Sequence, residues 1–160
     1  MSAPRDRDPA GRPRSARPRD ELGRPLGRGA AGVAVVPDGS RLTPVAALGL
    51  AQDFLDAGRP FHAHEVLEAV WRHAPAGERD LWRGLAQIAV GLTHARRGNA
   101  RGAAALLGRG GRAVGGYAGT SPHGIAAAAV ASAAATLAAQ LASGGLGTVT
   151  ESQLRLQLRG

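Results

Sequence analysis

The stretch from Phe61 to Asn99 decides the fold class, and it reads FHAHEVLEAVWRHAPAGERDLWRGLAQIAVGLTHARRGN. Two segments in which apolar residues recur at helical spacing flank a short break at residues 75–77, where Pro, Ala and Gly follow one another. Because the residue before a proline is disfavoured in a helix, a helix that begins at Pro60 must end before Pro75. The short break predicts that this helix and the next, which runs from near Glu78 to Gly98, pack against each other in antiparallel directions.

Start and stop signals outside this stretch predict three more helices. Thr43 is a candidate N-cap with Pro44 at the first helical position, and Gly58 ends the segment. Its apolar face is predicted to consist of Val45, Leu48, Ala51 and Leu55. Asn99 is a candidate cap for a further helix, and residues 121–122 (Ser-Pro) are expected to open an Ala-rich one that ends at residues 144–145 (Gly-Gly). The sequence thus predicts an all-α protein, a compact multihelical bundle of about five helices with an irregular N-terminal arm.

The chain divides into three parts by composition. Residues 1–40 are expected to form a flexible basic arm rich in Arg, Pro and Gly, in which GVAVV at 32–36, before a Pro-Asp-Gly turn, is the only strand-like run. Residues 41–145 are predicted to form the helical domain. Residues 146–160 are expected to be an irregular tail, in which Leu154, Leu156 and Leu158 alternate at strand spacing without an obvious partner strand.

Composition excludes some classes of site. The chain has no cysteine, so disulfides and thiolate metal sites are absent. The net charge is +8 and every basic residue is arginine, but the basic arm lacks aromatic residues for base stacking, so specific nucleic-acid binding is not expected. The Ala-rich segment at 125–142 contains Ser, Thr and Gln and is not predicted to span a membrane. We expect a cytoplasmic protein whose partner is a small ligand or another protein, and a homo-oligomer is compatible with the sequence.

Polar residues of the two central helices are predicted to converge. On a helical wheel His64, Glu65 and Glu68 share one arc, whereas His62 and His73 are turned to the solvent side. The following helix is apolar nearly all round, which is typical of a buried helix, and carries a thin polar stripe. An enclosed pocket is therefore predicted between the two helices, formed by His64, Glu65, Glu68, Arg83, Gln87 and His94. Trp71 and Trp82 are assigned to the core and Asn99 to a helix cap.

The spacing of these residues resembles a known family. FHAHEVLEAVWR followed by LWRGLAQIAVGLTHARRGNARGAAALL is similar to the bacterial and archaeal family called domain of unknown function 309, over about residues 43–115. The family pattern is F-x-x-H-E-x-x-E-x-x-W, then G-L-x-Q and H-x-x-x-G-N-x-x-G-A. It matches this chain at Phe61, His64, Glu65, Glu68, Trp71, Gly84, Leu85, Gln87, His94, Gly98, Asn99, Gly102 and Ala103. The resemblance implies a compact all-helical fold and supplies no reaction.

Three functions fit the polar cluster, and the sequence leaves open whether the protein is an enzyme. In a metal-dependent hydrolase, His64, Glu68 and His94 would bind zinc or manganese and Glu65 would act as general base, in a motif similar to H-E-x-x-H with Glu in place of the second His. In a metal-free enzyme, a buried carboxylate beside a histidine would exchange protons. In the third interpretation, which we favour, the cluster is a hydrogen-bonded network in a binding or structural module of unknown ligand.

Overall fold

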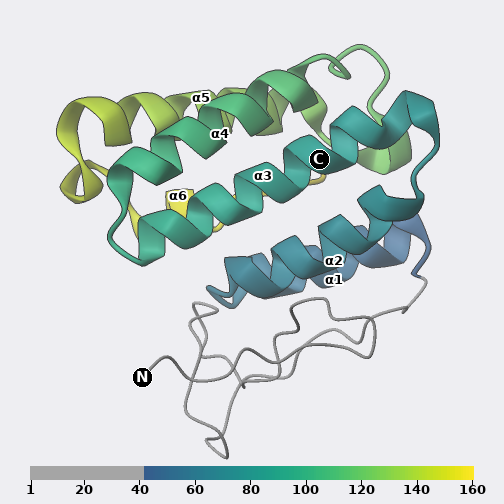
Figure 1. Cartoon of the computed structure of the whole chain (residues 1–160), viewed down its shortest axis with the longest axis horizontal. Helices are drawn as coiled ribbons and strands as arrows, with labels where there is room; N and C mark the ends of the chain where they lie inside the picture. Colours follow the sequence, from purple (N-terminus) through teal and green to yellow (C-terminus); the bar gives the residue numbers. More distant parts are fainter. Residues whose placement is uncertain (1–41) are drawn as a thin grey trace, which may run out of the picture.

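Helices make up most of residues 42–160, the part of the chain that the computed structural model describes (Figure 1). The long helices are α1 (Pro44–Asp56), α2 (Pro60–His73), α3 (Arg79–Arg96), α4 (Ala100–Gly115) and α5 (Ala127–Gly144). Between and after them lie the 3-10 turns η1 (Ala76–Glu78), η2 (Pro122–Gly124) and η3 (Leu146–Thr148), and the short helix α6 (Glu151–Leu154). The prediction of an all-α fold with about five helices is confirmed. The predicted arm at 1–40 lies outside the described residues.

Local signals position the first four helices. The Thr43 hydroxyl accepts a hydrogen bond from the Ala46 N–H at 3.2 Å, and the Asn99 side-chain oxygen accepts one from the Gly102 N–H at 3.0 Å, so both are the predicted N-caps. Gly58 and Gly98 follow α1 and α3 with φ of +74° and +87°, a conformation that glycine adopts without strain. The predicted boundaries of α1 to α3 and the predicted start of α4 are therefore correct to within one or two residues.

The predicted start of the fifth helix is wrong. Residues 121–122 open only the turn η2, and α5 begins at Ala127 without a side-chain cap. Between them, Ile125 has an extended backbone and is fully buried, and it forms an isolated antiparallel bridge with Arg159. The Ala126 N–H also donates to the Leu158 carbonyl at 2.9 Å. Pairing with the chain end thus keeps residues 125–126 out of the helix.

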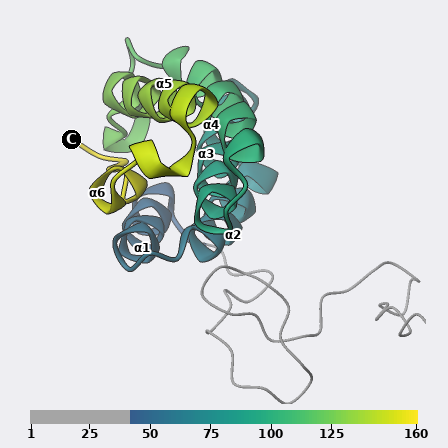
Figure 2. The same ribbon diagram turned by 90° about the vertical axis from the view of Figure 1, so that its left-hand side faces the viewer.

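The long helices follow one another around a shared core. The extensive helix–helix contacts in residues 42–160 are all between chain neighbours, from α1 with α2 to α4 with α5, and Figures 1 and 2 show this succession. α3 is the most buried helix, with Trp82, Leu85 and Leu92 fully enclosed. It approaches α4 closely because small residues meet there: a Cβ added to Gly110 would lie 2.6 Å from the Gly84 carbonyl oxygen. Gly84 and Gly91 of α3 thus admit the backbone of α4.

The C-terminal residues close the gap between α5 and α1 (Figure 2). Leu156 and Leu158 are buried, as their alternation suggests, and their backbone bonds to the side chain of Gln52 in addition to the bond from Ala126. Gln52 of α1 donates to the Leu156 carbonyl at 3.1 Å and accepts from the Leu158 N–H at 2.8 Å. α6 is attached to α3 through Arg96 and Glu151, whose charged groups are 2.8 Å apart. Residues 146–160, predicted to be an irregular tail, are therefore an ordered part of the core.

The exposure of Val45 and the hydropathy of α5 add to or differ from the predictions. Val45, assigned to the apolar face of the first helix, is 54% exposed, because α1 turns Ala47, Leu48, Ala51 and Leu55 inward instead. Within residues 42–160, α5 is the one helix that is long enough and apolar enough to cross a membrane, with a mean hydropathy of 1.3. Only its length and composition indicate a membrane span, and the core helices of other proteins meet the same two conditions. α5 packs against α4, and its buried residues are Val130, Ala134, Leu137 and Leu141.

Candidate functional site

A groove of about 250 Å³ lies where α2 and α3 run side by side. Each helix contributes a pair of polar side chains four residues apart, which places both members on one face. α2 supplies His64 and Glu68, and α3 supplies Arg83 and Gln87. The remaining walls are largely apolar and consist of Trp71, Ala86, Val90 and Leu106. Four of the six predicted pocket residues therefore converge.

The groove is open to solvent, so the prediction of an enclosed pocket is wrong. Arg83 is exposed and Gln87 is half-buried. The reason lies on the other side of α3, where Gly84 and Gly91 face α4 at contact distance. Because α4 packs on this glycine face, the polar stripe of α3 is left along the outer edge between α2 and α4, and Leu106 of α4 forms part of the groove wall.

The carboxylate of Glu68 is held between two partners on its own helix. Its Oε2 lies 2.8 Å from His64 Nε2, and its Oε1 accepts a hydrogen bond from the Arg72 guanidinium at 2.8 Å. Burial lowers the pKa of His64, and the nearby Glu68 carboxylate offsets part of that effect. A neutral His64 therefore donates its Nε2–H to Glu68 at neutral pH.

The second nitrogen of His64 is not presented to the groove. Nδ1 is buried, and the backbone of Phe61 lies close enough to the imidazole to raise the pKa of His64 in part. With Nε2 bonded to Glu68, neither ring nitrogen is in a position to take a proton from a molecule in the groove. This geometry argues against His64 as a general base for a ligand bound there.

Glu65 and His94, the other two predicted pocket residues, do not line the groove. His94 Nδ1 is 3.1 Å from the side-chain nitrogen of Asn99, so the two side chains join the end of α3 to the cap of α4. Asn99 thus has two functions in the turn, since its oxygen caps α4. His64 and His94 lie on different helices, so their separation of 30 residues in the sequence does not predict a contact between them.

The residues do not fit the predicted metal site. Within residues 42–160, no group of three or more His, Asp or Glu side chains lies close enough to hold a metal ion. His64 and Glu68 are adjacent, but His94 is engaged at the α3–α4 turn instead of completing the set. Two ligands on one helix fall short of the three protein ligands typical of a catalytic zinc site.

The prediction for His62 is also wrong. It was placed on the solvent side of the second helix, yet it is fully buried, whereas His73 is exposed as predicted. Its ring centroid lies 5.4 Å from that of Phe54 and 6.0 Å from that of Phe61. Burial, aided by the charge of Arg59, lowers the pKa of His62. The wheel of α2 alone could not show this, because α1 supplies Phe54.

The two tryptophans have different environments. Trp82 is fully buried, as predicted. Trp71 is only partly buried and lines the groove, so its assignment to the core is incomplete. A signal for its position exists in the sequence, because Trp71 follows Glu68 by three residues and shares its helical face.

Comparison with known proteins identifies the central part of the chain. Residues 48–106 match the family model described as Domain of unknown function (DUF309). No curated protein and no solved structure matches the chain. The matched region runs from the middle of α1 to the middle of α4 and includes every residue that lines the groove, while α5 and the closing C-terminal segment lie beyond it. Residues 48–106 are therefore similar to a DUF309 domain, and they lie within an all-helical protein.

Proposed function

We propose that this protein is a binding module, and that the groove between α2 and α3 takes a small ligand with an apolar body and an anionic head, such as a carboxylate. The observation that supports this proposal is the distribution of charge in the groove. Both oxygens of Glu68 already have cationic or hydrogen-donating partners, His64 and Arg72. Within residues 42–160, Arg83 makes no hydrogen bond or ion pair with another residue.

An unpaired guanidinium beside a neutralised carboxylate leaves the groove with an excess of positive charge. Guanidinium groups match carboxylates in geometry and can bind them through two parallel hydrogen bonds. Gln87, one turn further along α3, adds an amide that can donate a hydrogen bond to the same anion. Trp71, Val90 and Leu106 offer an apolar surface for the rest of the molecule.

Binding is favoured over catalysis because the groove lacks a free proton acceptor. His64 uses Nε2 for Glu68, and its Nδ1 is buried. A metal-dependent reaction finds no support either, since the described residues offer no cluster of three ligands. A purely structural network would not explain why Arg83 and Gln87 line the groove.

The test is a titration of isotope-labelled protein with benzoate, followed through backbone amide chemical shifts. We expect saturable shifts at α2 and α3 with a dissociation constant in the millimolar range, as befits a probe of few atoms. Benzyl alcohol, a neutral analogue, should bind at least several-fold more weakly. Arg83→Gln should weaken benzoate binding, whereas Arg79→Gln, which removes an exposed arginine of the same helix outside the groove, should not. Equal shifts with both probes, or none, would reject the proposal.

A further inference from the structure

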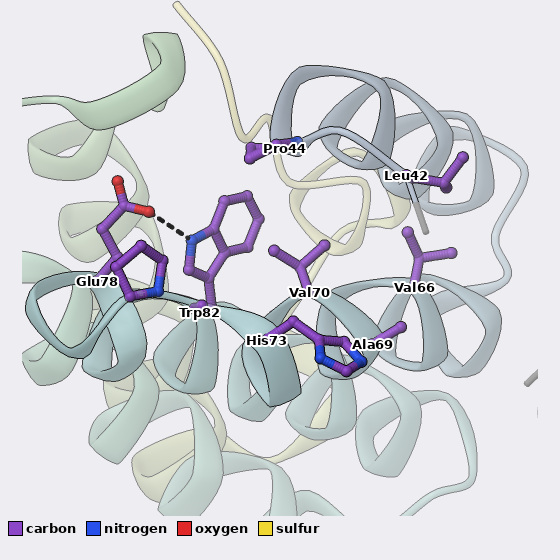
Figure 3. A pocket seen from close by; sticks show the side chains of 10 residues that line it. Leu42, Pro44, Val66, Ala69, Val70, His73, Glu78 and Trp82 are labelled. Carbon is purple, nitrogen blue, oxygen red and sulfur yellow. Dashed lines mark hydrogen bonds between the residues drawn. The ribbon is translucent and has the colours of Figure 1, made fainter. Parts of the chain in front are cut away.

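A second pocket, of about 180 Å³, lies between the start of α1, the C-terminal half of α2 and the start of α3 (Figure 3). It shares no lining residue with the groove described above. Its walls are mainly apolar, and Figure 3 shows Val66 and Val70 of α2 between Trp82 on one side and Leu42 on the other. Glu78 supplies a carboxylate at the Trp82 end.

The Trp82 end of this pocket is fixed by contacts from two turns. Glu78 Oε2 accepts a hydrogen bond from the Trp82 indole at 3.4 Å, and its Oε1 is 2.8 Å from His123 Nε2. The His123 ring lies 5.9 Å from that of Trp82, and His123 adopts a φ of +57°, which is unusual for a residue with a side chain. Tyr117 adds a hydrogen bond to the Gly77 carbonyl at 2.8 Å. The pocket is therefore pre-formed at this end.

The opposite end carries an apolar side chain that is open to solvent. Leu42, which lines the pocket there, is 39% exposed. The other exposed large hydrophobic residues in 42–160 are Val45 and Leu146, and neither lines the pocket. An exposed apolar side chain on the wall of an apolar pocket leaves surface that a further apolar group can cover.

We propose that this pocket binds residues 33–36 of the same chain, VAVV. The described part of the chain begins at Leu42, on the pocket wall, and only residues 37–41 separate it from this run. At about 3.5 Å per residue that linker spans up to roughly 20 Å, and its Pro-Asp-Gly sequence favours a reversal of chain direction. The run contains all three valines of residues 1–41, so it is the part of that segment best suited to an apolar site.

Tethering favours this occupant over a second copy of the chain. A short flexible linker holds its end at an effective concentration in the millimolar range, far above the micromolar concentration of a separate molecule in a typical experiment. The apolar side chains of residues 33–36 would cover Leu42 and the α2 wall without requiring a partner. This inference is independent of the anion-binding function proposed for the groove.

The absence of cysteine from the natural chain allows a direct test with engineered pairs. Ala69 lines the pocket from α2, so Ala69→Cys places one thiol there. In the full chain we combine it with Val33→Cys, Val35→Cys or Val36→Cys in turn, and with Ala16→Cys as a matched control. A disulfide requires the two Cα atoms to come within about 7 Å. In a glutathione redox buffer at micromolar protein, at least one valine position should cross-link within the monomer at least tenfold faster than the control.

A substitution that weakens docking should abolish this difference. We add Val35→Asp to the pair that contains Val33→Cys or Val36→Cys, and Val33→Asp to the pair that contains Val35→Cys. The pair that cross-links fastest should then slow toward the control rate, because a carboxylate is poorly accommodated among Leu42, Val66 and Val70. Three results overturn the proposal: equal rates for all pairs, no cross-link at any valine position, or cross-links found only between molecules. The last result would identify a second copy of the chain as the occupant.

Discussion

The side chain of Gln52 bonds to the backbone on both sides of Gln157, accepting from the Leu158 N–H at 2.8 Å and donating to the Leu156 carbonyl at 3.1 Å. One amide group on α1 thus performs the role of a neighbouring strand for the C-terminal segment. The side chains of the two bonded residues, Leu156 and Leu158, are buried. This contact joins residues more than 100 positions apart and closes the succession of helices.

Loss of this amide should loosen the C-terminal closure. Gln52→Leu keeps the apolar part of the side chain but leaves the Leu158 N–H and the Leu156 carbonyl without their partner. We expect the free energy of unfolding to fall by about 1–3 kcal/mol, measured by urea denaturation. Hydrogen exchange of the Leu158 amide should accelerate selectively. Ser152→Ala, at an exposed position of α6 whose hydroxyl makes no hydrogen bond within residues 42–160, is the control and should cost much less; equal losses would contradict the role of Gln52.

The fully buried His62 should make stability depend on pH. Because burial lowers its pKa in the folded state below the ordinary value of 6.5, the unfolded chain takes up a proton first as pH falls. Stability is therefore complete above about pH 6.5 and decreases as pH falls from there toward the lowered folded-state pKa. The burial of His64 acts in the same direction.

The contribution of His62 can be separated by substitution. His62→Leu should reduce the difference in unfolding free energy between about pH 7.5 and about pH 5.5, and should raise stability at the lower pH by about 1 kcal/mol or more, since no charged form remains to be buried. His73→Leu, at an exposed position of the same helix, should leave the pH dependence unchanged. An unaltered pH dependence in His62→Leu would show that other groups are responsible.

Two glycines of α4 should respond in opposite ways to alanine. A Cβ at Gly110 would lie 2.6 Å from the Gly84 carbonyl oxygen and 2.8 Å from the Ile88 side chain, so Gly110→Ala should force α3 and α4 apart and cost about 1–3 kcal/mol. At Gly108 the only contact within 4 Å is the Arg112 guanidinium at 3.7 Å. Gly108→Ala should therefore stabilise the helix by about 0.5–1 kcal/mol. Thermal denaturation of the two variants gives the comparison, and similar shifts in both would exclude close packing as the cause.

Divalent metals should not stabilise the His64–Glu68 pair. A metal that binds the folded protein would raise its melting temperature by mass action. Because we expect no binding, the melting temperature of the natural protein should be the same with Zn²⁺, with Mn²⁺ and with a chelator. Glu68→Gln should lower the free energy of unfolding by about 1–2 kcal/mol, since charge-assisted contacts to His64 and Arg72 become neutral ones. A metal-dependent gain that disappears in Glu68→Gln would instead restore the metal-binding hypothesis.

The sequence predicted most of the helices and part of the candidate site. The helix ends depend on contacts within a few residues, so they can be predicted without knowledge of the tertiary structure. Examples are the caps Thr43 and Asn99 and the glycines after α1 and α3. Helical spacing likewise placed His64 beside Glu68 and Arg83 beside Gln87. Spacing also puts His94 on the face of Gln87, but it could not show that His94, two turns further along α3, bonds to Asn99 instead of reaching the groove. It could not predict an open groove either, because that depends on which side of α3 is covered by α4.

What the sequence alone determined is therefore the local part of the structure: the fold class, four of the five long helices, the caps of α1 and α4, and the composition of each helical face. The tertiary structure decided which of those faces are buried. Phe54 of α1 covers His62, α4 occupies the glycine face of α3, and the Leu158 N–H donates its hydrogen bond to Gln52. The physical reason is that burial and backbone pairing at these points come from residues distant in the chain, and helical periodicity describes one helix at a time.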